Sequence, residues 1–576
     1  MKLYNYKYQT MKKTIFSLGV VMLFLTFSTK ALTLSKISTQ PELTEVLKNI
    51  PTHFIPTPNM EQIKKEDALA GKKGTLYRVG IATYTNLNTT NSGVWTTLST
   101  GEKKWQLIIQ NPGAEALSFI FNTFKLSRNS SFWVQTKTGE KVSKIHTQED
   151  LLEDFQQNVA LCYGDELVLT LIDKPNEPQS ELNLGRVFYN YRSTGNKGKE
   201  KINESSPCEV NVNCIEGNDY QEEKRGIALV YIVEGQTAGY CSGSLVNNLA
   251  NDCKPLFLTA LHCGVSTTAS DMLLWKFYFR YEAISCTNPT SVGTLFSHYV
   301  NSCIRLSDSD DNGGDSGSDF LLLHLGTVAN ETATINTLRS TAINAYWNGW
   351  DANNTPSSGG VGIHHPSGDI KKISTYTVAP TSSSFGGQVQ NTHWDLGWSG
   401  TTNGYGITEE GSSGSPLFTY NNGSSRIIGT LTGGATYCDA LTAHDEYGKV
   451  SFHWKSNGST PAKKLATYLD PLNSGILVLN GSANPCSGAG IKELETNNEI
   501  IIFPNPTSDK LNLDLTNLVN QKVTIEIIDM TGKTINISSH STDSIINIEL
   551  GELTKGVYQI KINSKDSIII KRILKI

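Results

Sequence analysis

The longest apolar run of the chain lies near its N-terminus. Lys12 and Lys13 precede a mostly apolar run over residues 15–27, and small residues follow up to Ala31. A basic start, a short apolar core and small residues before a cleavage site are typical of a secretory signal peptide, whereas a run of this length is too short to span a bilayer comfortably. We therefore assign residues 1–31 to a signal peptide. The alternative is a buried helix.

Short apolar or alternating runs, separated by polar turns, dominate residues 32–201. They include residues 107–109, 118–121 and 166–171, and they predict the strands of a mixed, mostly β segment. We find no catalytic constellation in this part of the sequence. Residues 194–201 are rich in lysine, glycine and asparagine, which predicts an exposed linker of the kind where proteolytic cuts concentrate.

Residues 202–475 contain many short strand-like runs separated by glycine-rich turns. This pattern is typical of a β-sandwich or β-barrel. The best helix candidate is residues 461–469. The strand-like runs include residues 226–233, 256–258, 272–281, 320–325, 416–420, 427–432 and 448–454.

The last part of the chain has a different pattern. Residues 476–499 are polar and predict a second linker. Beyond them, Leu511, Leu513 and Leu515 share one face of a predicted strand, and residues 523–527 repeat the alternation. Alternation with a period of two over several runs predicts a small β-sandwich over residues 500–576.

Composition limits the function classes. The chain has 576 residues, so about three or four domains are expected at roughly 100–200 residues each. Its net charge of −5 offers no basic field for nucleic acid, and no later apolar run is long enough for a membrane span. Ten cysteines without a CxxC pair favour an oxidising compartment over a zinc site.

Three local signals carry candidate chemistry. His262 ends a buried-type strand beside Cys263, Asp319 opens the apolar residues 320–323, and Ser413 lies in the GSSGSP of residues 411–416. A rigidly held histidine can act as general base, a buried carboxylate can fix its tautomer, and glycines around a serine permit a turn that aims N–H groups at one point. Taken singly, they are also explained by a core histidine, a strand-end cap and a flexible linker. Together they follow the chain order of chymotrypsin-like barrels.

The sequence around these residues resembles bacterial lysyl endopeptidases, which are secreted trypsin-like serine proteases. The resemblance covers about residues 203–475 and implies a double β-barrel with His262 as general base, Asp319 as its orienting partner and Ser413 as nucleophile. It also implies an oxyanion hole made by the backbone N–H groups of Gly411 and Ser413, and no cofactor or metal. The motifs that carry it are CSGSLVNN at 241–248, TALHCG at 259–264, SDF at 318–320, IHHP at 363–366 and GSSGSP at 411–416.

The same resemblance implies that Asp445 binds the lysine side chain of the substrate, with Gly433 and Gly434 in the substrate-binding set. The position where trypsin itself keeps an acid is Ile407, so Asp445 would have to supply the negative charge. The alternative is that Asp445 is an ordinary exposed turn residue, in which case Glu446 is the next candidate.

Two positions depart from the family pattern. Family members place a histidine and a tryptophan beside the catalytic histidine, whereas this chain has Thr432 and Phe385 there. The departure leaves the triad intact and bears on the pH optimum and the turnover rate.

One further motif suggests a metal and is set aside. Asp308, Asp310, Asn312 and Gly313, followed by Asp319, fit a calcium-loop pattern loosely. An EF-hand needs a helix on each side, and no helical pattern flanks these residues. We therefore predict a polar surface loop.

Eight cysteines lie in residues 202–475 and allow 105 pairings by spacing alone. The family pattern leaves two of these cysteines, Cys253 and Cys303, without a partner, and we pair them with each other by elimination. Cys162 and Cys486 lie outside the segment and stay unassigned. The resemblance implies the disulfides Cys208–Cys438, Cys214–Cys286 and Cys241–Cys263.

The final segment resembles the type A C-terminal sorting domain of the Bacteroidetes type IX secretion system. The matching features are FPNP at 503–506, GVY at 556–558 and the basic end KRILK at 571–575. The resemblance implies export to the periplasm, passage across the outer membrane and removal of this segment. The alternative is a small carbohydrate- or protein-binding sandwich.

These features predict a mostly β precursor with a signal peptide (1–31), a propeptide (32–201), a trypsin-like double barrel (202–475), a linker (476–499) and an Ig-like sandwich sorting domain (500–576). We expect a secreted monomer that hydrolyses peptide bonds after lysine through an acyl-enzyme on Ser413. Its partners would be lysine-containing protein or peptide substrates and the type IX machinery, and it would act at the cell surface or in the medium. The alternative is a secreted adhesin or inactive homologue that uses the barrel only for binding.

Overall fold

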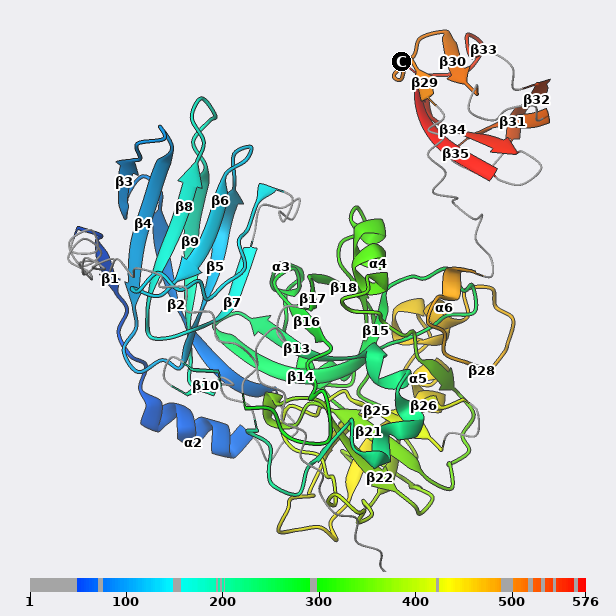
Figure 1. The fold of residues 1–576 in the computed structure, drawn as a ribbon. Helices are drawn as coiled ribbons and strands as arrows, with labels where there is room; N and C mark the ends of the chain where they lie inside the picture. Colours follow the sequence, from blue (N-terminus) through cyan, green and yellow to red (C-terminus); the bar gives the residue numbers. More distant parts are fainter. Residues whose placement is uncertain are drawn as a thin grey trace, which may run out of the picture. The chain divides into compact units, whose positions relative to one another are not determined.

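Strands make up most of the regular structure of the described residues, and the helices there are few and short (Figure 1). The predicted signal peptide and the linker lysines Lys197 and Lys201 lie outside the described residues. Within the predicted linker, β10 (Gly195–Asn196) and β11 (Lys199–Glu200) form a short antiparallel pair. The computed structural model describes residues 49–70, 76–148, 157–192, 195–196, 199–200, 203–290, 298–420, 424–487, 501–515, 522–529, 534–541, 545–563 and 568–575.

The first nine strands form two sheets around a shared core. Their bounds are β1 (Thr52–Phe54), β2 (Tyr77–Asn88), β3 (Val94–Thr97), β4 (Lys103–Gln110), β5 (Ala116–Lys125), β6 (Ser131–Gln135), β7 (Gln157–Tyr163), β8 (Glu166–Asp173) and β9 (Glu181–Asn190). One sheet has the order β1-β4-β8-β6 with β3 added to β4, and the other runs β2-β9-β5-β7. Leu107 and Leu169 of the first sheet pack with Phe119 and Leu184 of the second. The three predicted runs lie in β4, β5 and β8, which confirms the mostly β segment.

Seven further strands extend the second of these sheets. They are β13 (Ile227–Glu234), β14 (Thr237–Leu245), β15 (Leu256–Thr259), β16 (Lys276–Phe279), β17 (Tyr299–Asn301), β18 (Cys303–Asp308) and β19 (Leu321–Leu325). Strand β14 pairs with β2, with Thr237 opposite Ile81 and Tyr240 opposite Tyr77. One continuous 11-stranded sheet therefore joins the N-terminal segment to the first barrel, and the sequence pattern did not predict this continuity.

A second sheet of ten strands carries the rest of the protease-like region. Its main order is β12-β22-β21-β25-β26-β27-β24-β23, and β20 pairs with both β26 and β28. The bounds are β12 (Val210–Asn211), β20 (Gly349–Asp351), β21 (Gly360–His364), β22 (Lys372–Tyr376), β23 (Thr381–Ser383), β24 (His393–Leu396), β25 (Pro416–Thr419), β26 (Arg426–Gly434), β27 (Asp445–Lys449) and β28 (Val478–Leu479).

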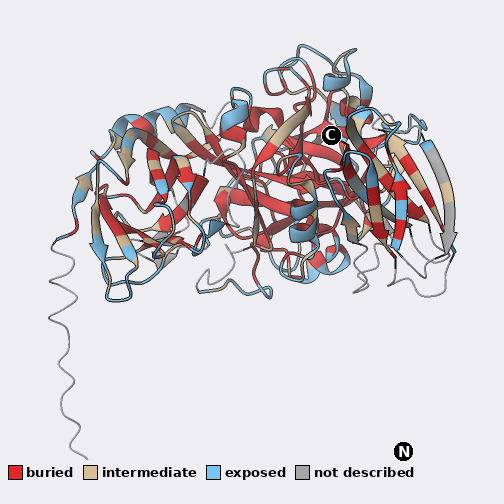
Figure 2. Cartoon of the chain, turned by 90° about the horizontal axis from the view of Figure 1, so that it is seen from above, coloured by how far each residue is buried: buried red, intermediate tan, exposed pale blue. Residues whose placement is uncertain are grey.

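The two barrel sheets meet through a common apolar core. Leu258 and Phe320 of the first barrel pack in one cluster with Ile363 and Ile427 of the second. Buried residues dominate the strands of this region (Figure 2). Because β15 ends and β19 begins at this core, the residues just outside these strands are held on a rigid base.

The helices differ from the prediction. They are α2 (Met60–Ala70), α3 (Ala269–Met272), α4 (Glu331–Arg339), α5 (Val450–Lys455) and α6 (Ala466–Leu469). The predicted helix at 461–469 is a 3₁₀ turn followed by α6. The predicted strand at 448–454 is wrong beyond Lys449, where α5 begins: Val450, His453 and Trp454 are buried, and this i, i+3, i+4 spacing is helical.

Four disulfides are formed in the described residues, and Cys162 and Cys303 are free and buried. Three of them are the pairings that the resemblance implies. The pairing of Cys253 with Cys303 is wrong, because Cys253 is bonded to Cys486. This bond and the pairing of β28 with β20 attach residues 478–486 to the barrels, so this part of the predicted linker belongs to the protease-like region, beyond the predicted boundary at 475.

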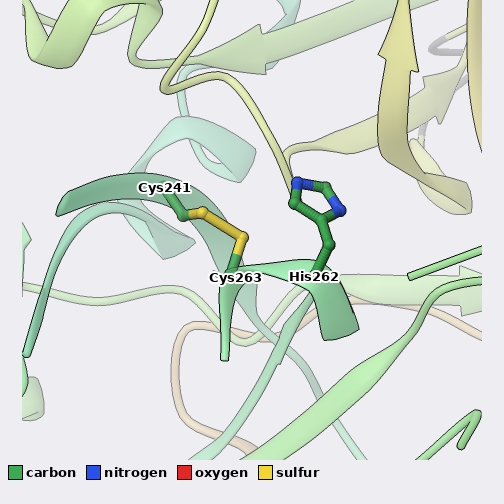
Figure 3. Close-up of side chains that lie close together, drawn as sticks. All are labelled: Cys241, His262 and Cys263. Carbon is green, nitrogen blue, oxygen red and sulfur yellow. A yellow bond between two sulfur atoms is a disulfide. The ribbon is translucent and has the colours of Figure 1, made fainter. Parts of the chain in front are cut away.

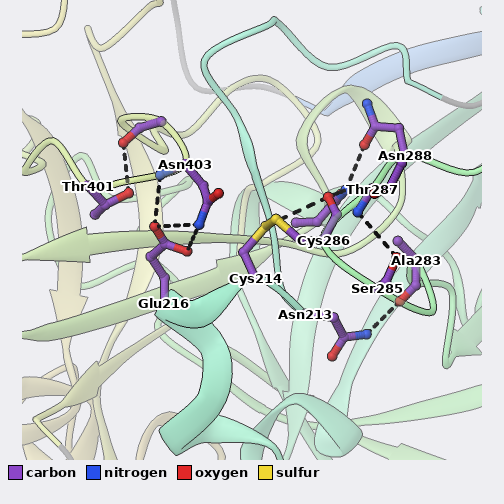
Figure 4. Close-up of a disulfide and its surroundings, with 12 residues drawn as sticks. Asn213, Cys214, Glu216, Ala283, Ser285, Cys286, Thr287, Asn288, Thr401 and Asn403 are labelled. Atoms are coloured by element: carbon purple, nitrogen blue, oxygen red, sulfur yellow. Dashed lines mark hydrogen bonds between the residues drawn. A yellow bond between two sulfur atoms is a disulfide. The ribbon is translucent and has the colours of Figure 1, made fainter. Parts of the chain in front are cut away.

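The start of the barrel region is fastened at several points around the Cys214–Cys286 disulfide (Figure 4). Asn213 Nδ2 donates a hydrogen bond to the carbonyl of Ala283 at 2.5 Å. The backbone N–H and the side-chain amide of Asn403 both donate to Glu216. Residues 213–216 are thereby tied to loops from both barrels.

The C-terminal strands form the predicted small sandwich. One sheet has the order β29-β30-β33 and the other β32-β31-β34-β35. Leu511 and Leu513 pack with Val523, Ile525 and Ile560 in one core. The strands are β29 (Ile501–Phe503), β30 (Lys510–Asp514), β31 (Lys522–Asp529), β32 (Thr534–Ser541), β33 (Ile545–Glu549), β34 (Gly556–Asn563) and β35 (Ile568–Lys575).

Candidate active site

His262 lies in a 3₁₀ turn (Leu261–Cys263) directly after β15. The neighbouring Cys263 is bonded to Cys241 of β14, so the turn is covalently tied to the adjacent strand, and Figure 3 shows the imidazole beside this bridge. Both ends of the turn are thus fixed, which a general base needs in order to keep its ring within reach of a nucleophile.

Asp319 contacts His262 through both carboxylate oxygens. Its Oδ2 lies 2.6 Å from Nδ1 of the imidazole, and its Oδ1 accepts the backbone N–H of His262 at 2.9 Å. Since an ionised carboxylate can only accept, Nδ1 carries the proton and Nε2 presents its lone pair. Nε2 is buried and has no hydrogen-bond partner in the described part of the chain. The structure therefore brings the predicted base and its predicted orienting residue together.

Ser413 stands on the facing loop, just before β25. Its carbonyl accepts the backbone N–H of Ser242 at 2.8 Å, which joins this loop to β14 of the first barrel. The residue is partly exposed, unlike Ser412 and Ser415 on either side. Its hydroxyl makes no hydrogen bond to His262 Nε2 among the described residues. Catalytic hydrogen bonds of this kind are often long or misaligned before substrate binds.

The backbone N–H groups of this loop divide into two sets. The N–H groups of Ser412, Gly414 and Ser415 donate to backbone carbonyls within the molecule. Those of Gly411 and Ser413 donate to no group of the described residues. Gly411 has a φ of +93°, a backbone conformation that side chains rarely adopt. The two free N–H groups are the pair predicted to form the oxyanion hole.

Three hydrogen bonds that the sequence did not reveal hold this loop in shape. The Ser412 hydroxyl lies 2.8 Å from Nδ1 of His364 and accepts the N–H of Glu409 at 3.2 Å. The Ser242 hydroxyl donates to the carbonyl of Gly411 at 2.9 Å. His364 and Ser242 lie within two of the motifs quoted above, but a motif does not indicate which of its side chains meets another.

Asp445 is buried at the start of β27, opposite Gly434 of β26. Its Oδ2 accepts hydrogen bonds at 2.7 Å from the indole of Trp398 and from the hydroxyl of Thr408, and the hydroxyl of Thr436 lies 2.8 Å from Oδ1. Burial raises the pKa of Asp445 above its ordinary value, against the lowering effect of these donors. The alternative of an exposed turn acid is therefore wrong.

The other predicted specificity positions lie around this carboxylate. A Cβ added at Gly434 would fall 1.9 Å from Asp445 Oδ1, so only glycine allows the carboxylate to approach here. Gly433 faces the ring of Phe385. Ile407 is fully buried and apolar, and Glu446 is partly buried.

His393 is a further histidine near the site that the sequence did not single out. Its Nε2 lies 2.9 Å from the Thr432 hydroxyl, and its ring lies 5.8 Å from that of Phe385. Burial lowers the pKa of His393 to about 4, and the charge of Asp319 opposes this shift. A neutral histidine therefore lies next to Thr432 and Phe385, the two positions at which the chain departs from the family pattern.

One cluster of metal-ligating side chains is found among the described residues: Cys241, His262 and Cys263. Because the two cysteines are joined to each other (Figure 3), neither offers the thiolate that a metal would bind. The cluster is a disulfide beside a histidine.

The two barrel sheets define a chymotrypsin-like fold. Within that class, residues 202–448 match the family model described as the C-terminal domain of lysyl endopeptidase, and residues 501–576 match the secretion system C-terminal sorting domain. The lysyl endopeptidase of Pseudomonas aeruginosa strain PAO1 is 28% identical over 294 residues, which are 49% of this chain and 57% of that protein. The chain thus matches little more than half of that relative's length.

Solved structures similar to this chain include two other proteases. One is a thermostable serine protease, AL20, from an extremophilic microorganism (16% identity, TM-score 0.27, 40% of this chain and 93% of that one). The other is the protease Anisep from Arthrobacter nicotinovorans (15% identity, TM-score 0.26, 39% and 90%). Separately, no helix among the described residues is long and apolar enough to cross a membrane.

Proposed function

We propose that this protein is a secreted serine endopeptidase that cleaves peptide bonds after lysine, with Ser413 as nucleophile, His262 as general base and Asp319 as its orienting partner. One observation carries the proposal: His262 is held by Asp319, and its Nε2 and the N–H groups of residues 411 and 413 on the facing loop have no hydrogen-bond partner in the part of the chain that the structure describes. A base without a partner and an unoccupied pair of donors are the two parts that acyl transfer requires.

The proposed reaction follows from these groups. The Ser413 oxygen attacks the scissile carbonyl carbon while its proton passes to His262 Nε2. The oxygen of the tetrahedral intermediate takes a negative charge, which the N–H groups of Gly411 and Ser413 stabilise. His262 then gives its proton to the leaving amine, and the acyl-enzyme remains on Ser413. Water attacks that ester by the same route, again with His262 as base. Asp319 stabilises the imidazolium that forms in each step.

Lysine specificity is proposed from Asp445. A lysine ammonium that leaves water needs a carboxylate partner. Asp445 is a buried carboxylate that accepts a hydrogen bond from Thr408, and Thr408 precedes Ser413 by five residues. Glycines at 433 and 434 leave room on the facing strand. The absence of a side chain at either position matters because the substrate must pass close to this backbone.

We further propose that the chain is made as a precursor. The lysines at 197, 199 and 201 are candidate cut sites for the enzyme itself, and the segment before them would be the propeptide. The C-terminal sandwich supports export by the type IX route, because it matches a secretion sorting domain. Removal of this segment would release the protease at the cell surface or into the medium.

A fluorophosphonate probe tests the proposed activity. It reacts with a serine only where a base and an oxyanion hole activate that serine. We expect the wild-type chain to label, the Ser413→Ala variant not to label, and the matched Ser415→Ala variant to label like wild type. A correctly processed wild-type protein that does not label would favour the binding-module alternative.

A further inference from the structure

We propose that Asp311 is a positioning residue for the triad, acting on the backbone of Asp319 and on the loop that packs against His262. The inference rests on the function proposed above. No sequence motif pointed to Asp311: the calcium-like pattern uses the residues on either side of it.

The acidic residues of this loop have separate environments. Asp308 is ion-paired with Arg305, and Asp310 is an exposed residue paired with Lys463. Asp311 is only 3% exposed. The prediction of a polar surface loop therefore holds for Asp308 and Asp310 and is wrong for Asp311.

The carboxylate of Asp311 is saturated by backbone donors. Its Oδ2 accepts the N–H of Asp319 at 2.8 Å, and its Oδ1 accepts those of Gly313 and Gly314 at 3.2 and 3.1 Å. N–H groups can only donate, so three of them converging on one side chain select the ionised acid. Hydrogen bonds to a charged acceptor are about twice as strong as neutral ones.

The contact with Asp319 bears on an unusual backbone conformation. Asp319 has a φ of +56°, in the left-handed region, where the Cβ of a residue with a side chain crowds the backbone. This conformation lets the Asp319 carboxylate reach both the N–H and Nδ1 of His262. The bond from its N–H to Asp311 holds the residue there: with β19 fixed in its sheet, a change to an ordinary φ would swing the preceding peptide, and with it this N–H, away from the acceptor.

The other two bonds hold the backbone that covers His262. A Cβ added at Gly313 would lie 2.8 Å from the Cβ of His262, and one at Gly314 would lie 3.1 Å from Thr432. Two glycines of positive φ therefore pack directly against the histidine and its neighbour. Asp311 accepts hydrogen bonds from both glycines, so it fixes the backbone that packs against His262 as well as the orientation of Asp319.

Asp311 also contributes charge. Titratable groups near this region include Asp319 and His262 of the first barrel and His393, His453 and Lys449 of the second. Burial keeps His393 and His453 neutral, and the charge of Lys449 acts in the same direction on His393. Burial first, and then the charge of Asp319, raise the pKa of Asp311. Two negative charges lie behind the imidazole, so Asp311→Asn removes one of the charges that stabilise the imidazolium form.

The test compares Asp311→Asn with Asp310→Asn in the full chain. The readout is the second-order rate of fluorophosphonate labelling of Ser413 across pH, because the acid limb of this profile reports protonation of His262. For Asp311→Asn we expect a rate at least about tenfold lower, from loss of a charged hydrogen bond. We also expect the acid limb to move to lower pH by about half a unit, the size of a single charge effect at intermediate dielectric. Asp310→Asn should match wild type in both.

Asp311→Ser is the second variant. Its hydroxyl can still accept the Gly313 N–H and keep the turn, while the charge and the contact with Asp319 are lost. The same shift of the acid limb is expected. An unmoved limb in either folded variant overturns the positioning role, as does failure of both to fold while Asp310→Asn folds, since Asp311 would then serve the loop fold alone. Absence of labelling in wild type would instead refute the proposed function, so the two failures are distinct.

Discussion

Replacing Asp445 by asparagine should remove the preference for lysine without removing catalysis. Both carboxylate oxygens of Asp445 are engaged in the free protein: Oδ2 by Trp398 and Thr408, and Oδ1 by Thr436. The hydroxyls can reorient to accept a bond, whereas the Trp398 indole and the Thr436 backbone N–H can only donate. An asparagine amide must therefore leave one of these two donors facing its own NH₂ group.

The size of the effect follows from the ammonium that loses its partner. Breaking one side of a buried ion pair costs on the order of 3–5 kcal/mol. At about 1.4 kcal/mol per tenfold, kcat/KM for lysyl substrates should fall by roughly two to nearly four orders of magnitude. The unsatisfied donor should also lower the free energy of unfolding by about 1–3 kcal/mol, which calls for a parallel measurement of Tm. Substrates with leucine at the cleaved bond should lose little.

The assay is kcat/KM for matched lysyl, arginyl, glutamyl and leucyl peptides on wild type and variant. Arginine should be the closer competitor and still weaker than lysine, because its guanidinium is longer and planar. Glu446→Gln is the matched control, since adjacent residues of β27 point to opposite faces of the sheet. Fluorophosphonate labelling of Ser413 should persist in both variants. An Asp445→Asn protein that keeps its full lysine preference would refute the reasoning, and a loss of preference in Glu446→Gln would move the pocket acid to that residue.

Four further outcomes are expected. Because burial raises the pKa of Asp445, acidification should lower the ratio of kcat/KM for lysyl and leucyl substrates at a pH above that at which an ordinary aspartate titrates. Both substrates depend on His262 in the same way, so the ratio removes that shared pH dependence. A ratio that stays constant down to about pH 4 would contradict this prediction. Asp319→Asn should lower kcat on a lysyl ester by about four orders of magnitude while leaving KM nearly unchanged, and a loss below tenfold would argue against its role. Ser413→Ala should accumulate as an uncleaved precursor in a host without other lysyl proteases, as judged by mass and N-terminal sequence; normal maturation would exclude self-processing. A chain ended at residue 499, which keeps Cys486 bonded to Cys253, should remain active yet stay in the periplasm of its native host, and its normal export would disprove the sorting role.

The sequence by itself determined the local features of this protein. Alternation predicted the C-terminal sandwich, because a period of two reports which side of a strand is buried, and short apolar or alternating runs predicted β4, β5 and β8. The strand ends at His262 and Asp319 could be read in the same way, since both follow or precede uninterrupted apolar runs. Their chain order with Ser413 then predicted one site, and the structure brings His262 and Asp319 into contact. The helix α5 differs from the strand predicted over residues 448–454, although its buried residues Val450, His453 and Trp454 have helical spacing.

Only the tertiary structure decided which distant residues meet. Cys253 pairs with Cys486 across 233 positions, and β2 adds to β14 across about 150 residues of chain. Hydrophobic periodicity carries no information on either, because it reports that a residue is buried and not what buries it. The same limit applies to single side chains. Asp311 and Asp310 are neighbours of equal chemistry in one polar loop, and the fold gives three backbone donors to the first and a surface lysine to the second.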